Sequence, residues 1–364
     1  MNKLNNLPLT QQIETTKVLK KAISANKALA NLNGVARIIP NSAILINSLV
    51  LQEAKDSSAI ENIITTHDEL YRANLDIESV TNEAKEVQNY KEALLRGFSL
   101  VKDTKLLLKK HIVEIQAVLE QNDAGVRKQA GTNLKNAQTG EVIYTPPQDY
   151  ETIQELLSNL ENYINEPNDI DPLVNMAIIH HQFESIHPFY DGNGRTGRII
   201  NILYLVLEDL LEVPILYLSR YIIKHKSDYY KLLNEVSFND GLNNWILFML
   251  KGVEEIAKET IETIKNIENL MNETKSIILE QKPKIYSKDL LEALFYHPYT
   301  KKAFIVEHLK ISRPTVTNYL NELENIGILS SKKIGKEIFY IHTKLFDLFK
   351  DMSLGEVRPK EMSW

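Results

Sequence analysis

The sequence contains no cysteine. Without thiols the protein can have neither a disulfide nor a metal site built on thiolates. The pattern Gly-x-x-x-x-Gly-Lys-Ser/Thr is also missing, which excludes the common P-loop. Neither a repeat of fixed period nor a low-complexity segment occurs.

Long apolar runs are missing as well. The most apolar stretch, residues 199–218, is interrupted by Glu208, Asp209, Glu212 and Pro214, so it predicts buried helices and not a membrane span. The first eight residues show no long apolar region of the kind that a signal peptide needs. We therefore expect a cytoplasmic protein with no membrane partner.

Charge and length bound the remaining classes. The 364 residues include 42 Lys and Arg against 48 Asp and Glu, a net charge of −6. That balance argues against a chain that binds nucleic acid throughout, but it allows one basic module. The length predicts two or three domains, and an apolar content of 43% is enough for ordinary packed cores.

The most informative stretch covers residues 187–198, which read His-Pro-Phe-Tyr-Asp-Gly-Asn-Gly-Arg-Thr-Gly-Arg. Apolar helical runs precede it at 175–184 and follow it at 199–207, so it should be a loop between two helices. Pro188 should end the first helix, because its ring cannot join the hydrogen-bond ladder and it biases His187 away from helical angles. The glycines let the backbone turn and approach a ligand closely.

The residue types in this loop suit a phosphate ligand. The second helix begins there, and its free N–H groups and positive dipole end favour an anion. Arg195 and Arg198 add donors that match phosphate oxygens. Asp191 is an oxygen ligand of the kind that Mg²⁺ takes together with phosphates, and His187 can exchange a proton near neutral pH. We interpret the stretch as a nucleotide-phosphate and Mg²⁺ site with a general base. The alternative is a Gly-rich loop whose His and Asp are incidental. It is disfavoured, because many residue types would then fall at fixed spacings by chance.

The stretch resembles the motif of the Fic family, His-Pro-Phe-x-Asp-Gly-Asn-Gly-Arg-x-x-Arg, at every fixed position. The resemblance implies transfer of AMP from ATP to a hydroxyl side chain of a target protein. His187 would be the base and Asp191 would hold Mg²⁺. Arg195 would bind the β-phosphate and Arg198 the γ-phosphate. The implied ATP-binding residues of the loop are Gly192, Asn193, Gly194, Arg195, Thr196, Gly197 and Arg198.

A second motif lies at residues 56–62. Ser58 and Glu61 have the spacing of a capping box, which would start a helix. In a Fic chain the same stretch also resembles the inhibitory motif Ser/Thr-x-x-x-Glu-Gly/Asn, with Ser57, Glu61 and Asn62 at its fixed positions. This resemblance implies that Glu61 pairs with Arg198, so that ATP binds with misplaced phosphates.

Turn residues at 136–140 separate two short extended runs and predict a β-hairpin. One interpretation is a surface hairpin of no special use. The Fic resemblance instead implies a flap that pairs with the backbone of the target beside His187. Its docking strand would consist of Thr132, Asn133, Leu134 and Lys135.

Two residue pairs near the motif have competing interpretations. In Fic proteins the segment of Tyr229 and Tyr230 borders the adenine, but packing of both rings in the core is equally favoured. His180 and His181 follow a helical run with no second His–carboxylate cluster, so we do not expect metal ligands. We expect His180 to pack in the core and His181 to lie at the surface or next to the site.

Residues 283–346 form a basic module, with ten Lys and Arg against six Asp and Glu. Predicted helices at 290–295, 300–309 and from Ser312 to Gly327, followed by strands at 328–330 and 337–341, resemble a winged helix. The residues that would face a DNA major groove are Arg313, Thr315, Thr317 and Asn318. Docking of another protein, or of a second copy to give a homodimer, is equally favoured because the charge excess is small.

Together these features predict a mainly α fold, with a Fic-like helical core, a small β-hairpin flap and a C-terminal winged helix. The expected domains are an N-terminal helical region (1–85), a Fic core (86–255), a connector helix (256–282) and a winged helix (283–350). The predicted function is protein adenylyltransferase acting on a Ser, Thr or Tyr hydroxyl, including self-modification, with ATP and Mg²⁺ and with inhibition by Glu61. Two alternatives stay open: removal of AMP at the same site, and a DNA-binding regulator that senses nucleotide.

Overall fold

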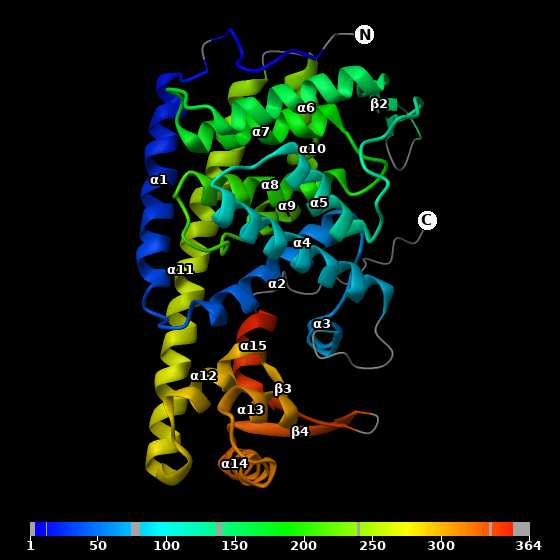
Figure 1. The fold of residues 1–364 in the computed structure, drawn as a ribbon. Helices are drawn as coiled ribbons and strands as arrows, with labels where there is room; N and C mark the ends of the chain where they lie inside the picture. Colours follow the sequence, from blue (N-terminus) through cyan, green and yellow to red (C-terminus); the bar gives the residue numbers. More distant parts are fainter. Residues whose placement is uncertain are drawn as a thin grey trace, which may run out of the picture. The chain divides into compact units, whose positions relative to one another are not determined.

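The computed structural model describes residues 4–11, 13–73, 81–135, 140, 142–238, 241–334 and 337–351. The fold is mainly helical, as predicted, with 69% of residues in helices (Figure 1). The chain divides into two compact units. The first comprises Met1–Gly34, Leu49–Ile64 and Glu86–Thr260, and the second comprises Val35–Ser48, Thr65–Lys85 and Ile261–Trp364.

The helices up to residue 281 are divided between the two units. They are α1 (Thr16–Ala36), α2 (Ser42–Ile60), α3 (His67–Ala73), α4 (Asn82–Thr104), α5 (Lys109–Glu120), α6 (Tyr150–Asn165), α7 (Pro172–Ile186), α8 (Asn193–Leu207), α9 (Ser219–Lys224), α10 (Lys226–Phe238) and α11 (Leu242–Gln281).

Helices α6, α7 and α8 form the centre of the first unit, and α7 packs against both of the others (green in Figure 1). Asp149 caps α6 by accepting a hydrogen bond from the Thr152 N–H, and apolar residues at helical spacing bury its inner face. Asp171 caps α7 in the same way and Pro172 starts it, as the sequence predicts. Every described residue from Leu173 to Ile186 is buried, so the loop that follows is held between two core helices.

Two helices differ from the sequence predictions. Apolar residues at helical spacing in residues 42–54 predict a helix that ends near Ala54, but α2 runs to Ile60. Residues 57–60 are therefore its last turn, and the capping-box interpretation, in which Ser58 starts a helix, is wrong. The alternating Glu and Lys of residues 251–280 predict a solvated connector helix. Helix α11 instead begins at Leu242 and buries a stripe of apolar residues along its length.

The predicted hairpin is present in the first unit. Strand β1 (Leu134–Lys135) pairs antiparallel with β2 (Val142–Tyr144), and Leu134 lies opposite Tyr144. The expected docking strand from Thr132 to Lys135 is thus shorter than predicted. Most of the predicted turn, residues 136–139, lies outside the described residues.

The C-terminal part of the second unit combines short helices with one antiparallel sheet. Its elements are a 3₁₀ turn (Pro283–Ile285), α12 (Lys288–Tyr296), β3 (Tyr299–Lys301), α13 (Lys302–Leu309), α14 (Arg313–Asn325), β4 (Leu329–Ile334), β5 (Glu337–His342) and α15 (Thr343–Asp351). The strand order is β3-β5-β4. Ser312 caps α14 by accepting a hydrogen bond from the Thr315 N–H, as predicted.

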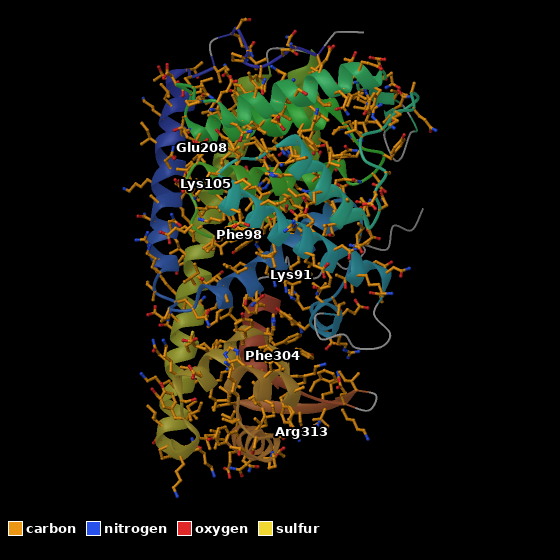
Figure 2. The ribbon with its side chains drawn as sticks, viewed as in Figure 1. Lys91, Phe98, Lys105, Glu208, Phe304 and Arg313 are labelled. Carbon is orange, nitrogen blue, oxygen red and sulfur yellow. The ribbon has the colours of Figure 1, made fainter. Side chains whose placement is uncertain are left out.

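Strand β3 and helix α15 were not predicted. Strand β3 occupies residues that we assigned in part to a helix, because Tyr299 pairs with Ile341 across the sheet. Helix α15 follows β5 directly. Among the residues expected to face DNA, Arg313 (Figure 2) and Asn318 are exposed, whereas Thr315 and Thr317 are half-buried.

Within the described part of the chain, no helix combines the length and the apolar character needed to cross a membrane.

Candidate active site

His187 ends α7 in a left-handed conformation, with φ 48° and ψ 60°. Pro188 stops the helix there, as predicted. Burial, and next the positive charge of Arg127, lower the pKa of His187 to about 4, although the charges of Glu61 and Asp191 act in the opposite direction. The imidazole is therefore neutral at pH 7, and its Nδ1 atom has no hydrogen-bond partner among the described residues.

The loop is closed on itself by Asn193. Its Oδ1 atom accepts a hydrogen bond from the Phe189 N–H, and its Nδ2 donates to the Phe189 carbonyl, both at 2.9 Å. Gly192 then turns the chain with φ 76°, and the Thr196 N–H donates to the Gly192 carbonyl at 2.8 Å as the first bond of α8. The N–H groups of residues 193–195 thus face outward from the helix end, an arrangement that favours an anion.

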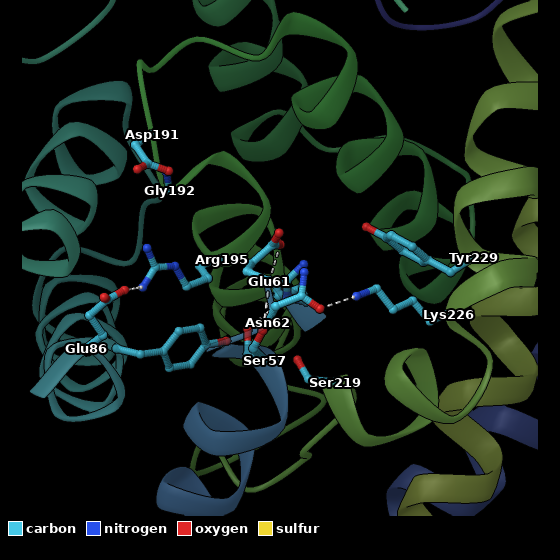
Figure 3. A network of polar contacts seen from close by, with 12 residues as sticks. Ser57, Glu61, Asn62, Glu86, Asp191, Gly192, Arg195, Ser219, Lys226 and Tyr229 are labelled. Atoms are coloured by element: carbon cyan, nitrogen blue, oxygen red, sulfur yellow. Dashed lines mark hydrogen bonds and ion pairs between the residues drawn. The ribbon is translucent and has the colours of Figure 1, made fainter. Parts of the chain in front are cut away.

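Arg198 is buried, and its guanidinium is held by Ser57 and Glu61, both of which are labelled in Figure 3. Its Nε donates to Ser57 Oγ at 2.8 Å and its Nη2 to the Ser57 carbonyl at 3.1 Å. The same Nη2 donates to Glu61 Oε1 at 2.8 Å. A Cβ atom on Gly194 would come within 2.6 Å of Glu61 Oε1, so this carboxylate lies against the start of α8.

The charge state of Glu61 follows from these contacts. Burial by itself would raise its pKa, but the charge and hydrogen bond of Arg198 outweigh burial and lower it. Glu61 is therefore ionised at neutral pH. Its carboxylate lies between Arg198 and the start of α8.

Helix α10 contributes the predicted tyrosines and one contact to the inhibitory motif. Lys226 Nζ donates to Asn62 Oδ1 at 3.3 Å. Tyr229 is buried, and its hydroxyl lies 2.7 Å from His180 Nε2, so this ring packs in the core. Tyr230 is 44% exposed and can contact a ligand.

The histidines of α7 are both buried. Packing of His180 in the core was predicted and is confirmed. The expectation that His181 reaches the surface is wrong, because α7 is covered on all sides. Burial lowers the pKa of His180 to about 3 and that of His181 to about 4, so both are neutral.

Arg195 is buried between two carboxylates. Its Nη1 donates to Glu86 Oε2 at 3.0 Å, and its Nη2 donates to Glu120 Oε1 at 2.8 Å. The carboxylate of Glu120 also lies against Gly192. Burial raises the pKa of Glu120, and the charge of Asp191 adds to that rise, while Arg195 opposes it.

Asp191 is exposed at the start of the loop, and its Oδ1 accepts a hydrogen bond from the Gly192 N–H at 2.7 Å. Within the described ranges, no group of three or more His, Asp or Glu side chains could hold a metal ion. A single carboxylate fits Mg²⁺ only when phosphates supply further ligands.

Arg127 connects the loop to the end of the hairpin. Its Nε donates to the His187 carbonyl at 2.8 Å, and its Nη2 donates to the Pro147 carbonyl. The Tyr144 hydroxyl adds a second connection by donating to the Ser185 carbonyl at 2.9 Å. These contacts place the hairpin beside His187.

Sequence reasoning missed four charged residues near the loop: Glu86, Glu120, Arg127 and Glu184. Glu184 is buried beside Gly197, its Oε1 has no hydrogen-bond partner among the described residues, and burial raises its pKa to about 7. Its position three residues before His187, about one helical turn away, was a local signal in the sequence that could have identified it. The other three come from distant segments, and no local pattern marks them.

Three parts of the chain match known protein families. Residues 19–99 match the Fic/DOC family N-terminal region, and residues 106–205 match the Fic/DOC family itself. Residues 270–345 match the C-terminal domain of SoFic-like protein adenylyltransferases. The loop at 187–198 lies inside the second match. The chain belongs to the Fic family.

Curated relatives of this Fic protein are similar over limited segments. A probable protein adenylyltransferase of Aquifex aeolicus is 38% identical over 79 residues, 22% of this chain and 24% of the relative. Protein adenylyltransferase fic-1 of Caenorhabditis elegans is 25% identical over 141 residues, 38% of this chain and 26% of the relative. The matches thus span about a quarter of the length of each relative.

Solved structures share the fold. A Fic family protein from Desulfovibrio desulfuricans has a TM-score of 0.58 at 19% identity, covering 91% of this chain and 97% of that one. The Fic-1 structure from C. elegans has a TM-score of 0.52 at 22% identity, covering 68% and 73%.

Proposed function

We propose that this Fic protein is a protein adenylyltransferase, which transfers AMP from ATP to a Ser, Thr or Tyr hydroxyl of a target protein and of itself. The observation that carries the proposal is a neutral His187 directly before a helix end that offers free N–H groups and two buried arginines. That is a proton acceptor beside an anion site. The names of the relatives, protein adenylyltransferases, support the same reaction.

In this proposal the triphosphate lies over the start of α8. The N–H groups of residues 193–195 bind phosphate oxygens, Arg195 binds the β-phosphate and Arg198 the γ-phosphate. Asp191, together with the phosphates, would hold Mg²⁺, which would neutralise part of the phosphate charge. Tyr230 is on α10, and its exposed ring would contact the adenine.

The chemical step is an in-line displacement at the α-phosphorus. His187 takes the proton from the target hydroxyl, whose oxygen forms a bond to the α-phosphorus. The bond from that phosphorus to the bridging oxygen breaks, and pyrophosphate leaves. Bound phosphates place negative charge near His187, which raises its pKa from about 4 toward the range that suits a base at neutral pH.

We propose further that Glu61 inhibits this reaction in the state seen here. A γ-phosphate and the Glu61 carboxylate are both anions, and both seek Arg198. The phosphates would therefore bind out of line with the attacking hydroxyl for as long as Glu61 stays in place.

Substitution of the base tests the proposed reaction. We expect His187→Ala, made in a Glu61→Gly background, to lose about 10²–10⁴-fold of AMP transfer, because loss of a general base typically costs that much. Transfer is measured with labelled ATP on the protein itself and in a cell lysate, and ATP affinity by calorimetry should stay nearly unchanged. His308→Ala in the second unit is the matched control.

Full transfer by the His187→Ala variant would refute the assignment of the base. Release of AMP from an already modified target, with no transfer from ATP, would favour AMP removal over the proposed reaction.

A further inference from the structure

Arg127 is a buried cation with no acidic partner. Its side chain is 0% exposed, and none of the ion pairs among the described residues includes it. Its Nη1 atom has no hydrogen-bond partner in the described part of the chain. A buried charge without a counter-charge is costly, so folding alone does not favour an arginine at this position.

The contacts of Arg127 join three segments. Its backbone N–H donates to the Pro188 carbonyl at 2.9 Å, and its Nε donates to the His187 carbonyl at 2.8 Å. Its Nη2 donates to the Pro147 carbonyl, which follows the hairpin. His187 is in the left-handed region with φ 48°, a conformation that costs a non-glycine residue energy and that a fixed carbonyl stabilises.

The charge of Arg127 also acts on the imidazole. After burial, it is the largest influence that lowers the pKa of His187. The groups that raise this pKa are the Glu184 carbonyl and the carboxylates of Glu61 and Asp191. A triphosphate bound over α8 would add more negative charge on the same side. Without a nearby cation, these anions would favour a protonated imidazole, which cannot act as a base.

We propose that Arg127 is a positioning residue. It holds His187 in its left-handed conformation and connects the end of the hairpin to the loop. It also keeps the imidazole in its unprotonated form when phosphates are bound. The inference rests on the proposed function, because it assigns to Arg127 a role in the transfer step. Within the described part of the chain, the side-chain hydrogen bonds of Arg127 go to backbone carbonyls, so it acts through His187 and the hairpin.

A titration of the imidazole tests the charge effect without any need for activity. The His187 ring is followed by ¹⁵N NMR in full-length protein and is identified by its absence in His187→Asn. In Arg127→Gln, which keeps a donor but removes the charge, we expect His187 to titrate at least about one pH unit higher than in the parent. Lys128→Gln, which removes a charge from the exposed neighbouring residue, should leave the titration unchanged.

Kinetics in the Glu61→Gly background test the positioning effect. With Arg127→Gln we expect the acid limb of the pH–rate profile to move to higher pH. This shift should equal the change in the His187 pKa that the NMR titration gives when ATP is bound. The KM for the target should rise at unchanged ATP affinity, because the hairpin is loosened. Tyr144→Phe removes the other tie between hairpin and α7 without changing charge, so it should raise the same KM and leave the pH profile in place.

Arg127→Lys keeps the inference testable if the Gln variant does not fold. Lysine retains the charge but cannot make both side-chain bonds, so it should raise the target KM with no shift of the pH profile. An unchanged His187 titration in Arg127→Gln, or a shifted pH profile in Arg127→Lys, would overturn the inference. If the Glu61→Gly parent itself transfers no AMP, the proposed function fails, whereas the titration still decides the effect of Arg127 on His187.

Discussion

Arg195 and Arg198 lie three residues apart on α8, and both are buried and ion-paired, yet their partners differ in origin. Arg198 is held by Ser57 and Glu61, two residues from one continuous turn at the end of α2. Arg195 is held by Glu86 from α4 and Glu120 from α5, two carboxylates on different, consecutive helices.

The contacts of Arg198 come from one short segment, whereas those of Arg195 come from two helices. In the proposed inhibition, movement of that one segment would release Arg198. Release of Arg195 would need separate changes in two helices. Although both proposed phosphate-binding arginines are paired with carboxylates, only the pair with Glu61 has the form of a switch.

Among the changes at the two arginine sites, removal of the Glu61 carboxylate should have the largest effect. We expect Glu61→Gly to raise AMP transfer roughly 10- to 100-fold, because it frees a charged hydrogen-bond donor worth about 1.5–3 kcal/mol to the γ-phosphate. Labelled AMP on the protein and its melting temperature are measured together. Glu61→Gln, which keeps the size but not the charge, should give a smaller gain.

Flat labelling in both Glu61 variants would show that the contact seen here does not restrain transfer. The comparison should be made near neutral pH. Because the pKa of Glu61 lies below its ordinary value, the pair with Arg198 persists at neutral pH and is lost only as the pH falls through that lowered pKa.

The second effect concerns the geometry of Arg198. We expect Arg198→Lys to lower ATP affinity several-fold in the Glu61→Gly background, since lysine lacks the planar fork that binds two oxygens at once. In protein that retains Glu61, Arg198→Lys should also weaken the inhibition. The increase in AMP transfer caused by Glu61→Gly should then be smaller in the Arg198→Lys variant than in the parent. Calorimetric ATP binding and labelled transfer measure both.

Arg96→Lys is the control for this substitution, because Arg96 forms an exposed pair with Glu114 away from the loop. ATP affinity that is equal for Arg198→Lys and its parent would contradict the assignment of Arg198 to the γ-phosphate.

The residues that contact Arg198 could be named from the sequence, whereas those that contact Arg195 could not. The loop at 187–198 and the inhibitory motif are contiguous patterns, so their residues could be named in advance. The geometry of the Glu61–Arg198 pair matches what the resemblance implies. Glu86, Glu120 and Arg127 reach the loop only through the packing of α4, α5 and the segment before the hairpin, and no spacing in the sequence reveals such contacts.

The fold shows the same division. Capped helices such as α7 and α14 were predicted from local signals. Strand β3 was missed because its pairing with β5 is not local. Helix α11 was misread because its surface charges were given more weight than the apolar residues at helical spacing on its other face.

The smallest effect should come from the carboxylates at Arg195. In the Glu61→Gly background we expect Glu120→Gln to tighten ATP binding by about two- to fivefold, the range of a partly solvated ion pair. Burial raises the pKa of Glu120, so loss of its charge should not lower the melting temperature. Glu86→Gln is the matched control, because the Glu86 side chain is 42% exposed and solvent already screens its charge. The effect of this change on ATP binding should be too small to resolve.

A gain from Glu120→Gln as large as that from Glu61→Gly would mean that carboxylates restrict ATP binding at both arginines. Weaker ATP binding would mean that Glu120 supports the cation at Asp191 and does not compete with phosphate for Arg195.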